Sequence, residues 1–401
     1  MNLFQTELRQ RLDDLRERNL FRELRRVDSA QGTRIQIGGK TLLNFSSNDY
    51  LGLANHPALK DAAIHAVEKF GTGAGASRLV CGSLAPFHEL EEALAQFKKT
   101  EAALTFSSGY ATALGTICAL AGKGDIIILD KLVHASIVDA AKLSGAKLRI
   151  FAHNDLNDLE NKLRWANANK SAIGQRPSAI LIITESIFSM DGDAAPLRET
   201  VELKNKFGAW LMADEAHATG IFGQTGRGLA DELGVSDQIE IQMGTLGKAF
   251  GASGGYICGS RALIDFLINR ARSFIFSTAP IPASAAAATA GVQIAQSNEG
   301  ETRRKILRER INQLQSAIGN RQSAIPSAIV PLILGDENKA LSAATKLREQ
   351  NIFVPAIRYP TVARGAARLR ITLTAAHSAD DVSTLVDALK KIGNRQSAIG
   401  N

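Results

Sequence analysis

Cysteine, aromatic residues and long apolar runs are all scarce in this sequence. Its three cysteines, Cys81, Cys118 and Cys258, are odd in number and lack the spacing of metal ligands or of a disulfide framework, so a disulfide-stapled secreted fold is excluded. No run of about 18 apolar residues occurs, which excludes a membrane-spanning helix. Because free cysteines suit a reducing compartment, the sequence predicts a cytoplasmic protein.

Charge of one sign is not strongly in excess either. Lys and Arg number 47 against 40 Asp and Glu, and the formal net charge is +7. This modest surplus fits an acidic substrate and an ordinary basic surface equally well. The segment Met1–Arg26 lacks the apolar core of a signal peptide, and its acidic residues argue against a transit peptide. We expect an amphipathic helix there.

The length of 401 residues predicts roughly two or three domains and a large core. Between residues 102 and 243, short apolar strands alternate with helical segments. That alternation predicts an α/β fold with a parallel, helix-covered sheet, whose ligands gather at the carboxyl ends of the strands. The predicted strands are Ala102–Phe106, Asp125–Leu129, Lys147–Phe151, Ala179–Thr184, Trp210–Ala213 and Ile239–Met243. The predicted helices between them are Ala111–Ala121, Ser136–Leu143, Asp155–Asn169 and Leu197–Lys206.

The two ends of the chain differ from this alternating region. Arg34–Asn44 contains Gly38-Gly39 and predicts a hairpin. After about residue 290 the chain has an α+β rhythm of its own, so we expect three ranges: 1–55 as an N-terminal helix and arm, 56–290 as a large domain, and 291–401 as a small C-terminal domain. Further helices are expected at Pro57–Phe70, Pro86–Phe97, Arg261–Arg272, Pro280–Gln296 with a continuation through Arg303–Leu314, Lys339–Gln350 and Ala379–Ile392. Further strands are expected at Ala328–Leu334, Ile352–Ile357 and Ala367–Thr374.

A seven-residue unit, Ser-Ala-Ile-Gly-Asn-Arg-Gln, recurs along the chain. It occupies Ser316–Gln322, returns within Ile392–Asn401, and has a looser copy at Ser171–Arg176. Its adjacent alanine and isoleucine, together with a glycine in each unit, do not suit the core positions of a coiled coil. We interpret the copies as tolerated surface insertions.

The stretch Gly244–Gly255 holds one lysine, Lys248, among glycines, alanines and small hydroxyl residues. Small and apolar surroundings remove water from an ammonium group and so favour its neutral amine. A neutral amine can form a Schiff base with an aldehyde or remove a proton from carbon. Taken alone, however, the stretch is more typical of a glycine-rich surface loop with a solvated lysine.

Two further motifs follow predicted strands. Asp214-Glu-Ala-His217 places an acid at a strand end, where it can keep a heteroaromatic nitrogen protonated; a helix-capping aspartate with an exposed histidine is an equally good interpretation. The same residues match an acidic motif of some NTPases, but neither Lys248 nor Lys123 completes the phosphate-binding pattern G-x-x-x-x-G-K-[ST]. Ser107–Tyr110 opens a helix, where free N–H groups suit a phosphate, although an ordinary serine cap is commoner.

Six motifs in one order carry a resemblance to a known family. They are Ser108-Gly109-Tyr110, His134-Ala-Ser-Ile137, His153-Asn-Asp155, Glu185 with Phe188-Ser-Met-Asp-Gly192, Asp214-Glu-Ala-His217 and Thr245-Leu-Gly-Lys248. From about Arg22 to about Leu389 the chain resembles the α-oxoamine synthases, which are fold-type I enzymes that use pyridoxal 5′-phosphate (PLP). The resemblance implies a large domain with a mostly parallel sheet and a small C-terminal α+β domain.

The resemblance also implies roles at a PLP site. Lys248 would hold the cofactor as a Schiff base, Asp214 would pair with the pyridine nitrogen, and His134 would stack on the ring; these three form the implied catalytic set. The other implied contacts are Gly109 and Tyr110 at the helix start, Ser189 and His217 at the ring oxygen, Thr245 at the phosphate, and Ser277 and Thr278. The last two resemble a segment that reaches the phosphate of a second subunit, so a homodimer with shared sites is expected.

The implied substrates are an amino acid and an acyl thioester. Asn44–Leu53, Ala356–Thr361 and Ala367–His377 most resemble the member of the biotin pathway, which condenses L-alanine with a pimeloyl thioester of coenzyme A or of a carrier protein and releases CO2. Arg370 would bind the amino-acid carboxylate. The acyl path would be lined by Arg22, Asn48 and Thr361 together with His134, with Arg25 or Arg26 as alternatives to Arg22.

Three alternatives stay open. The nearest is glycine C-acetyltransferase (2-amino-3-ketobutyrate coenzyme A ligase), which uses glycine and acetyl-CoA; the ending Thr372–His377 argues against it. A nucleic-acid-dependent NTPase built on Asp214–His217 would hydrolyse nucleotides without PLP. A PLP-binding protein without catalysis is disfavoured because lysine, aspartate and both histidines are all present.

Overall fold

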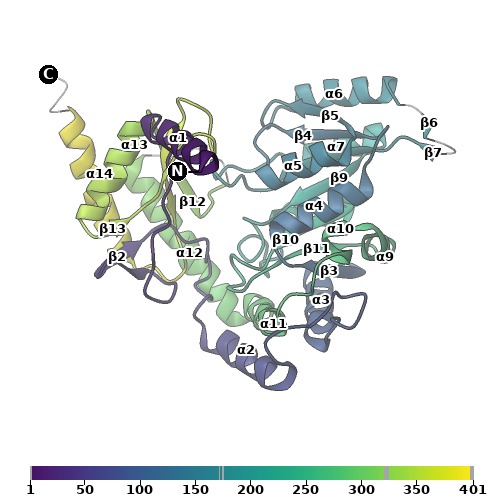
Figure 1. The fold of residues 1–401 in the computed structure, drawn as a ribbon, viewed down its shortest axis with the longest axis horizontal. Coiled ribbons are helices and arrows are strands. Elements are labelled where there is room, and N and C mark those ends of the chain that lie inside the picture. Colours follow the sequence, from purple (N-terminus) through teal and green to yellow (C-terminus); the bar gives the residue numbers. More distant parts are fainter. Residues whose placement is uncertain (1, 171, 174–175, 320–324, 398–401) are drawn as a thin grey trace. The chain divides into compact units, whose positions relative to one another are not determined.

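A computed structural model describes residues 2–170, 172–173, 176–319 and 325–397, and only the backbone is described at 172–173, 176–177 and 393–397. The residues form two compact units (Figure 1). Unit 1 comprises Met1–Ser47, Met190–Gly192 and Arg308–Asn401, and unit 2 comprises Asn48–Ser189 and Asp193–Leu307. These units do not coincide with the ranges 1–55, 56–290 and 291–401, because N-terminal strands pair with a C-terminal one.

Unit 2 is built on a seven-stranded sheet. In spatial order the strands are β3 (Ala102–Phe106), β11 (Gly255–Gly259), β10 (Ile241–Thr245), β9 (Trp210–Asp214), β8 (Ile180–Glu185), β4 (Ile126–Asp130) and β5 (Lys147–Phe151). All strands of this sheet run in one direction except β11, which is antiparallel to β3 and to β10. The expected mostly parallel sheet is therefore confirmed. The sequence did not predict β11, because two glycines bound an apolar run of only three residues there.

Helices cover both faces of this sheet. On one face, Ile117, Ile137 and Leu267 are buried against alternate residues of the strands, which removes their apolar surface from water. On the opposite face, Sγ of Cys258 lies 3.9 Å from the carbonyl oxygen of Leu94. The helices of the first face are α4 (Gly109–Leu120), α5 (Ala135–Ser144), α9 (Arg261–Arg270) and α10 (Arg272–Ile275), and α3 (Ala85–Lys98) lies on the second. The other elements of unit 2 are α2 (Pro57–Phe70), α6 (Leu156–Ala168), β6 (Ala172–Ile173), β7 (Arg176–Pro177), α7 (Leu197–Phe207), α8 (Leu229–Glu232), the 3-10 helix η1 (Ser236–Gln238) and α11 (Pro282–Gln296).

Unit 1 contains two small sheets. β1 (Arg34–Ile37) and β2 (Lys40–Asn44) form the predicted hairpin, with Gly38 and Gly39 at φ +57° and +74° in its turn, and β13 (Ile352–Phe353) adds to β2 in parallel. The second sheet has the order β12 (Ile329–Gly335), β15 (Ala367–Thr372) and β14 (Ala356–Ile357). The helices are α1 (Leu3–Glu17), α13 (Glu337–Glu349) and α14 (Ala379–Ser397), and α12 (Asn298–Ile318) has residues in both units.

Three local predictions are wrong. The first helix ends at Glu17 instead of extending to residue 26. The helix from Pro282 does not continue, because Ser297 takes an extended conformation and α12 starts anew. The expected strand 352–357 is divided at Pro355, which cannot donate to a strand partner, so that β13 and β14 join different sheets.

Parts of the three repeat copies lie outside the described residues, namely 171, 174–175, 320–324 and 398–401. Where the chain is described, α12 ends inside one copy and α14 extends into another. The interpretation of the copies as surface insertions stays a hypothesis.

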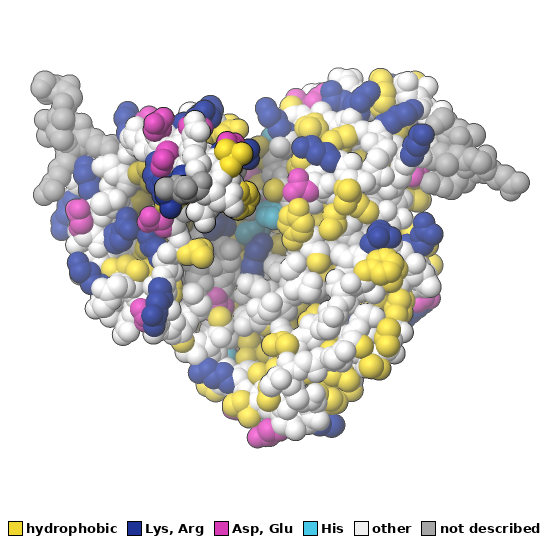
Figure 2. Space-filling model, viewed as in Figure 1, with side chains coloured by type: hydrophobic (Ala, Val, Ile, Leu, Met, Phe, Trp, Pro, Cys, Tyr) yellow, Lys and Arg dark blue, Asp and Glu magenta, His cyan; other side chains and the backbone are white. Residues whose placement is uncertain are grey.

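The surface agrees with the weak charge pattern of the sequence. Figure 2 shows Lys and Arg side chains scattered over the visible face, interspersed with Asp and Glu. Among the described residues, no helix combines the length and the apolar character that a membrane span requires. Cys81 is exposed, Cys118 is half-buried and Cys258 is buried, and all three thiols are free.

A buried ion pair joins α3 to the segment after β9. Nζ of Lys98 donates to Oε2 of Glu215 and to the carbonyl oxygen of Arg227. The side chains of Lys98 and Glu215 are 2% and 0% exposed, and Glu215 also accepts from the N–H of Ala230 at 2.9 Å. A buried charge that loses its partner is costly, so this pair holds the backbone next to Asp214 in place.

Replacing Lys98 with Met should lower the free energy of unfolding by about 3 kcal/mol, because Glu215 then stays buried without its cation. Chemical denaturation measures the change. The control is Lys99→Met at the exposed neighbouring position, which should change the free energy of unfolding by less than about 0.5 kcal/mol. Equal midpoints for the two variants would contradict a structural role of the pair.

Candidate active site

The carboxyl ends of three adjacent strands bring the predicted site together. β8 ends at Glu185, β9 at Asp214 and β10 at Thr245. The register pairs Glu185 with Asp214 and Asp214 with Met243, so the two acidic side chains project from neighbouring positions. Parallel sheets bind ligands at this edge, and the motifs singled out in the sequence lie there.

Asp214 is buried, with 5% of its surface exposed. Burial raises the pKa of its carboxyl above the ordinary value, while the charge of Lys248, the N–H of Ala216 and the charge of His134 act in the opposite direction. The N–H of Ala216 donates to Oδ1 at 2.9 Å. A cationic ring nitrogen placed against this carboxyl would favour its ionised form further, because opposite charges stabilise each other at a buried site.

Glu185 is 2% exposed and lies beside Asp214. Its Oε2 accepts from the N–H of Ser189 at 3.1 Å, whereas its Oε1 has no hydrogen-bond partner among the described residues. Burial first, and the charge of Asp214 second, raise the pKa of Glu185 well above its ordinary value. Two buried carboxyl groups this close cannot both ionise cheaply, so burial and the charge of Asp214 favour the protonated form of Glu185.

Lys248 lies half-buried in the loop between β10 and β11. Its Nζ is 2.7 Å from Nε2 of His217. On the other side of that ring, Nδ1 is 2.5 Å from the hydroxyl of Tyr50, which donates its proton to Oδ1 of Asn48 at 3.3 Å. A charged Lys248 can only donate, in which case the ring of His217 accepts at Nε2 and carries its proton on Nδ1, toward the hydroxyl of Tyr50. The chain of contacts therefore presents an acceptor nitrogen to the lysine.

His134 caps the start of α5. Its Nδ1 accepts from the N–H of Ser136 at 3.2 Å, so the proton of the neutral ring is on Nε2. Desolvation by the surrounding protein lowers the pKa of His134, although the residue as a whole is exposed; the charge of Asp214 raises this pKa and that of Lys248 lowers it. The three side chains are thus within electrostatic reach, and a neutral, partly open imidazole can stack on an aromatic ligand.

The start of α4 forms an anion-binding corner beside β10. Ser108 caps the helix, and the N–H groups of Gly109 and Tyr110 have no acceptor among the described residues. Gly255 pairs in register with Thr245, and a Cβ at Gly255 would lie 2.9 Å from Cα of Gly109. The helix start and Thr245 are therefore neighbours, and the free N–H groups with the helix dipole suit a phosphate.

Two of the predicted cofactor contacts use their hydroxyls within the protein. The hydroxyl of Tyr110 donates to Oδ2 of Asp139 at 2.8 Å, and this hydrogen bond raises the pKa of Tyr110. The hydroxyl of Thr245 donates to the carbonyl oxygen of Gly254 at 3.0 Å. Tyr110 therefore offers its backbone to the corner, while Thr245 keeps an oxygen that can still accept.

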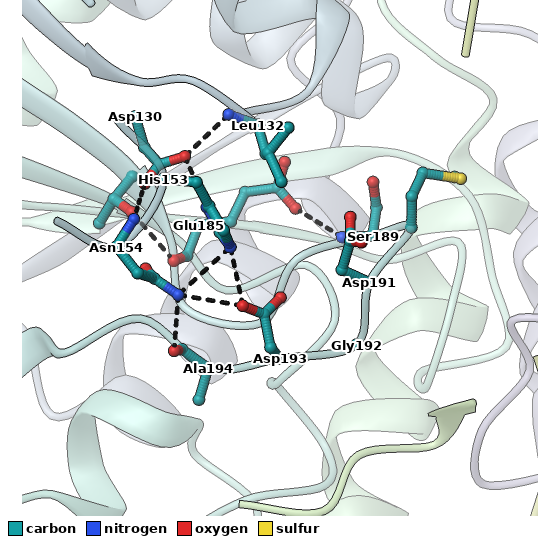
Figure 3. Close-up of polar contacts among 12 residues, drawn as sticks. Asp130, Leu132, His153, Asn154, Glu185, Ser189, Asp191, Gly192, Asp193 and Ala194 are labelled. Carbon is teal, nitrogen blue, oxygen red and sulfur yellow. Dashed lines mark hydrogen bonds and ion pairs between the residues drawn. The ribbon is translucent and has the colours of Figure 1, made fainter. Parts of the chain in front are cut away.

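Ser189 lies near the tip of an irregular hairpin that follows β8 (Figure 3). Ile187 pairs with Ala194 in an isolated bridge, and the N–H of Phe188 donates to the carbonyl oxygen of Asp193 at 3.0 Å. Ser189 is 9% exposed, and its N–H is held by the carboxyl of Glu185. The structure thus ties Ser189 to the acidic pair.

Ser277 and Thr278 follow α10. Thr278 is exposed and pairs with Ser77 in an isolated bridge, and Ser277 is half-buried. In the described part of the chain, no hydrogen bond joins either residue to the site around Lys248. Their predicted contact with a second subunit stays a prediction.

The predicted substrate residues divide between the units. Asn48 belongs to unit 2, whereas Arg22, Thr361 and Arg370 belong to unit 1. Nη2 of Arg22 donates to the hydroxyl of Thr361 at 3.1 Å, so these two lie together. Arg370 is 5% exposed in β15, and its Nη1 donates to the hydroxyl of Thr372 at 2.9 Å.

A cavity of about 560 Å³ in unit 1 surrounds Arg22 and Thr361. Arg358 donates there from Nη2 to the carbonyl oxygen of Phe21 at 2.7 Å, while its Nε has no partner among the described residues. Burial first, and then the charges of Arg22 and Arg25, lower the pKa of Arg358. An anion would relieve this repulsion, so the cavity suits a carboxylate or a phosphate. Its cationic lining residues are Arg16, Arg22, Arg25 and Arg358.

Sequence reasoning assigned no role to Tyr50 or Glu185. Tyr50 is fully buried, and only its contact with His217 distinguishes it from a core aromatic residue. Glu185 belongs to one of the six motifs that carry the resemblance, but its pairing with Asp214 depends on the strand register and is not visible in the sequence. Glu215, the second acid of the suspected NTPase motif, is paired with Lys98 instead of facing the site. No cluster of described residues has the arrangement of a metal site.

The sequence matches known proteins over nearly its whole length. The family model described as "Aminotransferase class I and II" matches residues 40–389. A curated relative from Geotalea daltonii, named 8-amino-7-oxononanoate synthase, is 46% identical over 392 residues, which cover 97% of this chain and 98% of the relative. A relative of the same name from Thermoanaerobacter pseudethanolicus is 42% identical over 397 residues, which cover 98% of each chain.

Solved structures share the fold. A serine palmitoyltransferase from S. paucimobilis, with a bound PLP–myriocin aldimine, matches with a TM-score of 0.90 at 29% identity and covers 99% of this chain and 100% of that one. An 8-amino-7-oxononanoate synthase from Francisella tularensis matches with a TM-score of 0.75 at 29% identity and covers 90% and 99%. The expected fold-type I architecture is confirmed.

The neutral acid at Glu185 predicts a pH-dependent stability of the cofactor-free protein. Its folded pKa is raised above the ordinary value of 4.5, so the folded state gains stability from the proton and loses it as the pH rises above that value. Glu185→Gln cannot ionise and escapes this loss. Calorimetry should show the melting temperature of E185Q rising relative to the parent by about 2 °C or more between about pH 5 and pH 8.

Glu202→Gln, on the exposed side of α7, is the matched control and should follow the parent at every pH. Parallel pH profiles for E185Q and the parent would mean that Glu185 is ionised in the folded protein.

Proposed function

We infer that this chain, which belongs to the class I and II aminotransferase family and within it to the 8-amino-7-oxononanoate synthases, joins L-alanine to a pimeloyl thioester. It is a PLP-dependent acyltransferase. The products would be 8-amino-7-oxononanoate, CO2 and the free thiol, as a step of biotin biosynthesis. The substrate proposal is carried by the identity of 46% over 97% of the chain with a relative that bears this name.

The residues at the sheet edge fit PLP by the chemistry of their groups. The N–H groups at the start of α4, next to Thr245, offer donors to the phosphate. The buried carboxyl of Asp214 matches the pyridine nitrogen. The amine of Lys248, which has an acceptor nitrogen beside it, matches the aldehyde.

Bound PLP supplies a protonated ring that accepts the negative charge developing at Cα of the amino acid. Asp214 keeps the ring nitrogen protonated. Lys248 would hold the cofactor, and its Nζ would also be the base that removes and returns the proton at Cα, where proximity lowers the barrier. His217, held by Tyr50, orients that Nζ and faces the ring oxygen together with Ser189.

The remaining residues of the site would orient the substrates. His134 would cover one face of the cofactor ring and exclude water from it, and its Nε2–H would be available to an acyl oxygen. Arg370, buried in β15, binds the carboxylate of L-alanine. Asn48 holds Tyr50 and lies along the acyl path.

The arginine cavity of unit 1 supports a dicarboxylic acyl group. A pimeloyl thioester ends in a free carboxylate, and the guanidinium groups of Arg22, Arg25 and Arg358 with the hydroxyl of Thr361 are donors that a carboxylate can use. An acetyl group carries no charge and would leave these cations unpaired. The cavity therefore favours pimeloyl over acetyl donors, and with it L-alanine condensation over glycine C-acetyltransferase.

A homodimer is supported by an exposed apolar patch on unit 2. The segments around Ser77 and Thr278 run side by side, with an isolated bridge and a hydrogen bond of 3.0 Å from the N–H of Ala279 to the carbonyl oxygen of Ala76. Large apolar side chains on them are more than half exposed, and such patches mark interaction surfaces. They are Leu79 at 53%, Val80 at 77%, Phe276 at 70% and Ile281 at 52%. A second copy covering this patch would bring Ser277 and Thr278 to the partner's cofactor.

The acyl group would arrive on coenzyme A or on an acyl carrier protein, since both present it as a thioester. The three free thiols support the proposal that the enzyme works in the reducing cytoplasm.

The function is tested by turnover and by labelling. Purified protein supplied with PLP should release thiol and CO2 from L-alanine and pimeloyl-CoA or pimeloyl-carrier protein, and much less from glycine and acetyl-CoA. Borohydride reduction followed by peptide mapping should place a pyridoxyl group on Lys248. Turnover of glycine and acetyl-CoA alone would replace the proposal with the C-acetyltransferase, and absence of label from Lys248 would contradict the assigned cofactor site.

Arg22→Met should raise KM for the pimeloyl thioester by about tenfold with little change in kcat, because a charge-assisted hydrogen bond to the far carboxylate is lost. Steady-state kinetics measure both constants. The matched control is Arg26→Met, since Arg26 pairs with Asp28 and does not line the cavity. An unchanged KM in R22M would mean that the acyl carboxylate binds elsewhere.

A further inference from the structure

A histidine outside the residues assigned above connects two strand ends of unit 2 (Figure 3). His153 follows β5, and its ring lies between two carboxylates: Nδ1 is 2.9 Å from Oδ1 of Asp130, and Nε2 is 2.7 Å from Oδ2 of Asp193. The ring stands edge-on to Phe188, with centroids 4.3 Å apart. The side chain of His153 is 23% exposed and that of Asp130 is fully buried.

The geometry requires a charged ring. Both ring nitrogens of His153 face carboxylate oxygens, so both must donate, which only the imidazolium can do. Burial by itself lowers the pKa of His153, but the hydrogen bonds and charges of Asp130 and Asp193 outweigh it and raise the pKa to about 10. The protonated ring contributes its full stabilisation at pH values below 6.5, the ordinary pKa of histidine. This stabilisation is lost only as the pH rises through the folded pKa of about 10. The bridge thus stays charged at neutral pH.

Asp130 connects this ring to the backbone that carries His134. Its Oδ1 accepts from the N–H of Leu132 at 2.8 Å as well as from His153, and its Oδ2 accepts from the N–H of Asn154 at 2.9 Å. His134 lies two residues beyond Leu132. One buried carboxylate therefore fixes both the imidazolium and the path of the chain from β4 to His134.

Asp193 connects the same ring to the hairpin that carries Ser189. Its carbonyl oxygen accepts from the N–H of Phe188, the residue before Ser189. Asn154, held at φ +56°, donates from Nδ2 to Oδ2 of Asp193 at 3.0 Å and to the carbonyl oxygen of Ala194 at 3.1 Å. His153 and Asn154, which are adjacent in the chain after β5, thus contact both the segment that leads to His134 and the hairpin that carries Ser189.

We propose that His153 is a positioning residue whose imidazolium couples segment 131–134 to segment 188–194 and so sets the spacing between His134 and Ser189. The proposal rests on the proposed function in one respect, namely that these two side chains contact the PLP ring from different strand ends. A PLP ring that two segments contact is sensitive to small displacements of either segment, because productive geometry tolerates errors of only about 0.5 Å. The imidazolium of His153, which is hydrogen-bonded to Asp130 and to Asp193, limits such displacements.

Two substitutions separate the halves of the bridge. The amide nitrogen of an asparagine falls near the position of Nδ1, so His153→Asn keeps a donor for Asp130 and loses the one for Asp193. The amide nitrogen of a glutamine falls near the position of Nε2, so His153→Gln keeps a donor for Asp193 and loses the one for Asp130.

Hydrogen exchange in the full-length, cofactor-free protein reports on each half. We expect H153N to speed exchange in 188–194 by about tenfold, with a smaller change in 131–134, and H153Q to show the reverse order. PLP titration, followed by absorbance, should give an affinity reduced by about tenfold in both variants.

The control breaks a different ion pair, between the buried Lys204 and the exposed Glu240. Lys204 donates to Glu240, which also accepts from the N–H of Leu211 at 2.8 Å near the start of β9, at the amino end of the strands. Lys204→Met should lower the melting temperature but leave exchange in both segments and PLP affinity within about twofold of the parent.

The proposal is overturned if H153N and H153Q leave exchange in both segments and PLP affinity within twofold of the parent. It is equally overturned if they speed exchange uniformly over unit 2, because that pattern describes a loss of global stability. Since exchange is measured without cofactor or substrate, a failure to turn over L-alanine and a pimeloyl thioester would refute the proposed function and leave this test intact.

Discussion

Two carboxyl groups buried side by side, Glu185 and Asp214, are the constraint on which the site depends. The parallel register of β8 and β9 puts them next to each other, and burial makes two negative charges there too costly. Burial and the charge of Asp214 therefore favour the protonated form of Glu185, and Lys248 lies within electrostatic reach of both groups. A protonated heterocycle is a second cation that the same edge can accept. The acidic pair thus explains why a lysine and a pyridinium belong in one site.

Charge at the strand ends also makes the surrounding backbone rigid. Lys98 with Glu215 holds the chain just after Asp214, and His153 with Asp130 and Asp193 links the end of β4 to the hairpin after β8. Each of these pairs is largely removed from water, so breaking one leaves an uncompensated charge instead of a solvated side chain. The loops at this edge hold the residues assigned to the chemistry. Buried ion pairs fix the backbone of these loops more firmly than is usual for loops.

Chemistry and selectivity rest on different parts of the chain. The fold is shared at 29% identity with a serine palmitoyltransferase, so it does not by itself distinguish between acyl groups. The residues assigned to proton transfer are in unit 2, whereas the arginine cavity is in unit 1. A cavity lined by mutually repelling guanidinium groups suits an anion, which is the basis for the proposed dicarboxylic acyl group. Relatives 42–46% identical and named 8-amino-7-oxononanoate synthase agree with that chemistry.

The sequence alone determined the alternation of strands and helices, because hydrophobic periodicity and turn-forming residues are local properties. The order of its motifs also singled out Lys248, Asp214, His134 and His217. It could not predict β11, whose short apolar run between glycines becomes a strand only when β3 and β10 flank it. The roles of Tyr50, Glu185 and His153 were decided by tertiary structure, since each depends on a partner brought near by the sheet. Tyr50 reads as a core residue until its hydroxyl is seen to contact His217, and His153 is held charged because two carboxylates face its ring.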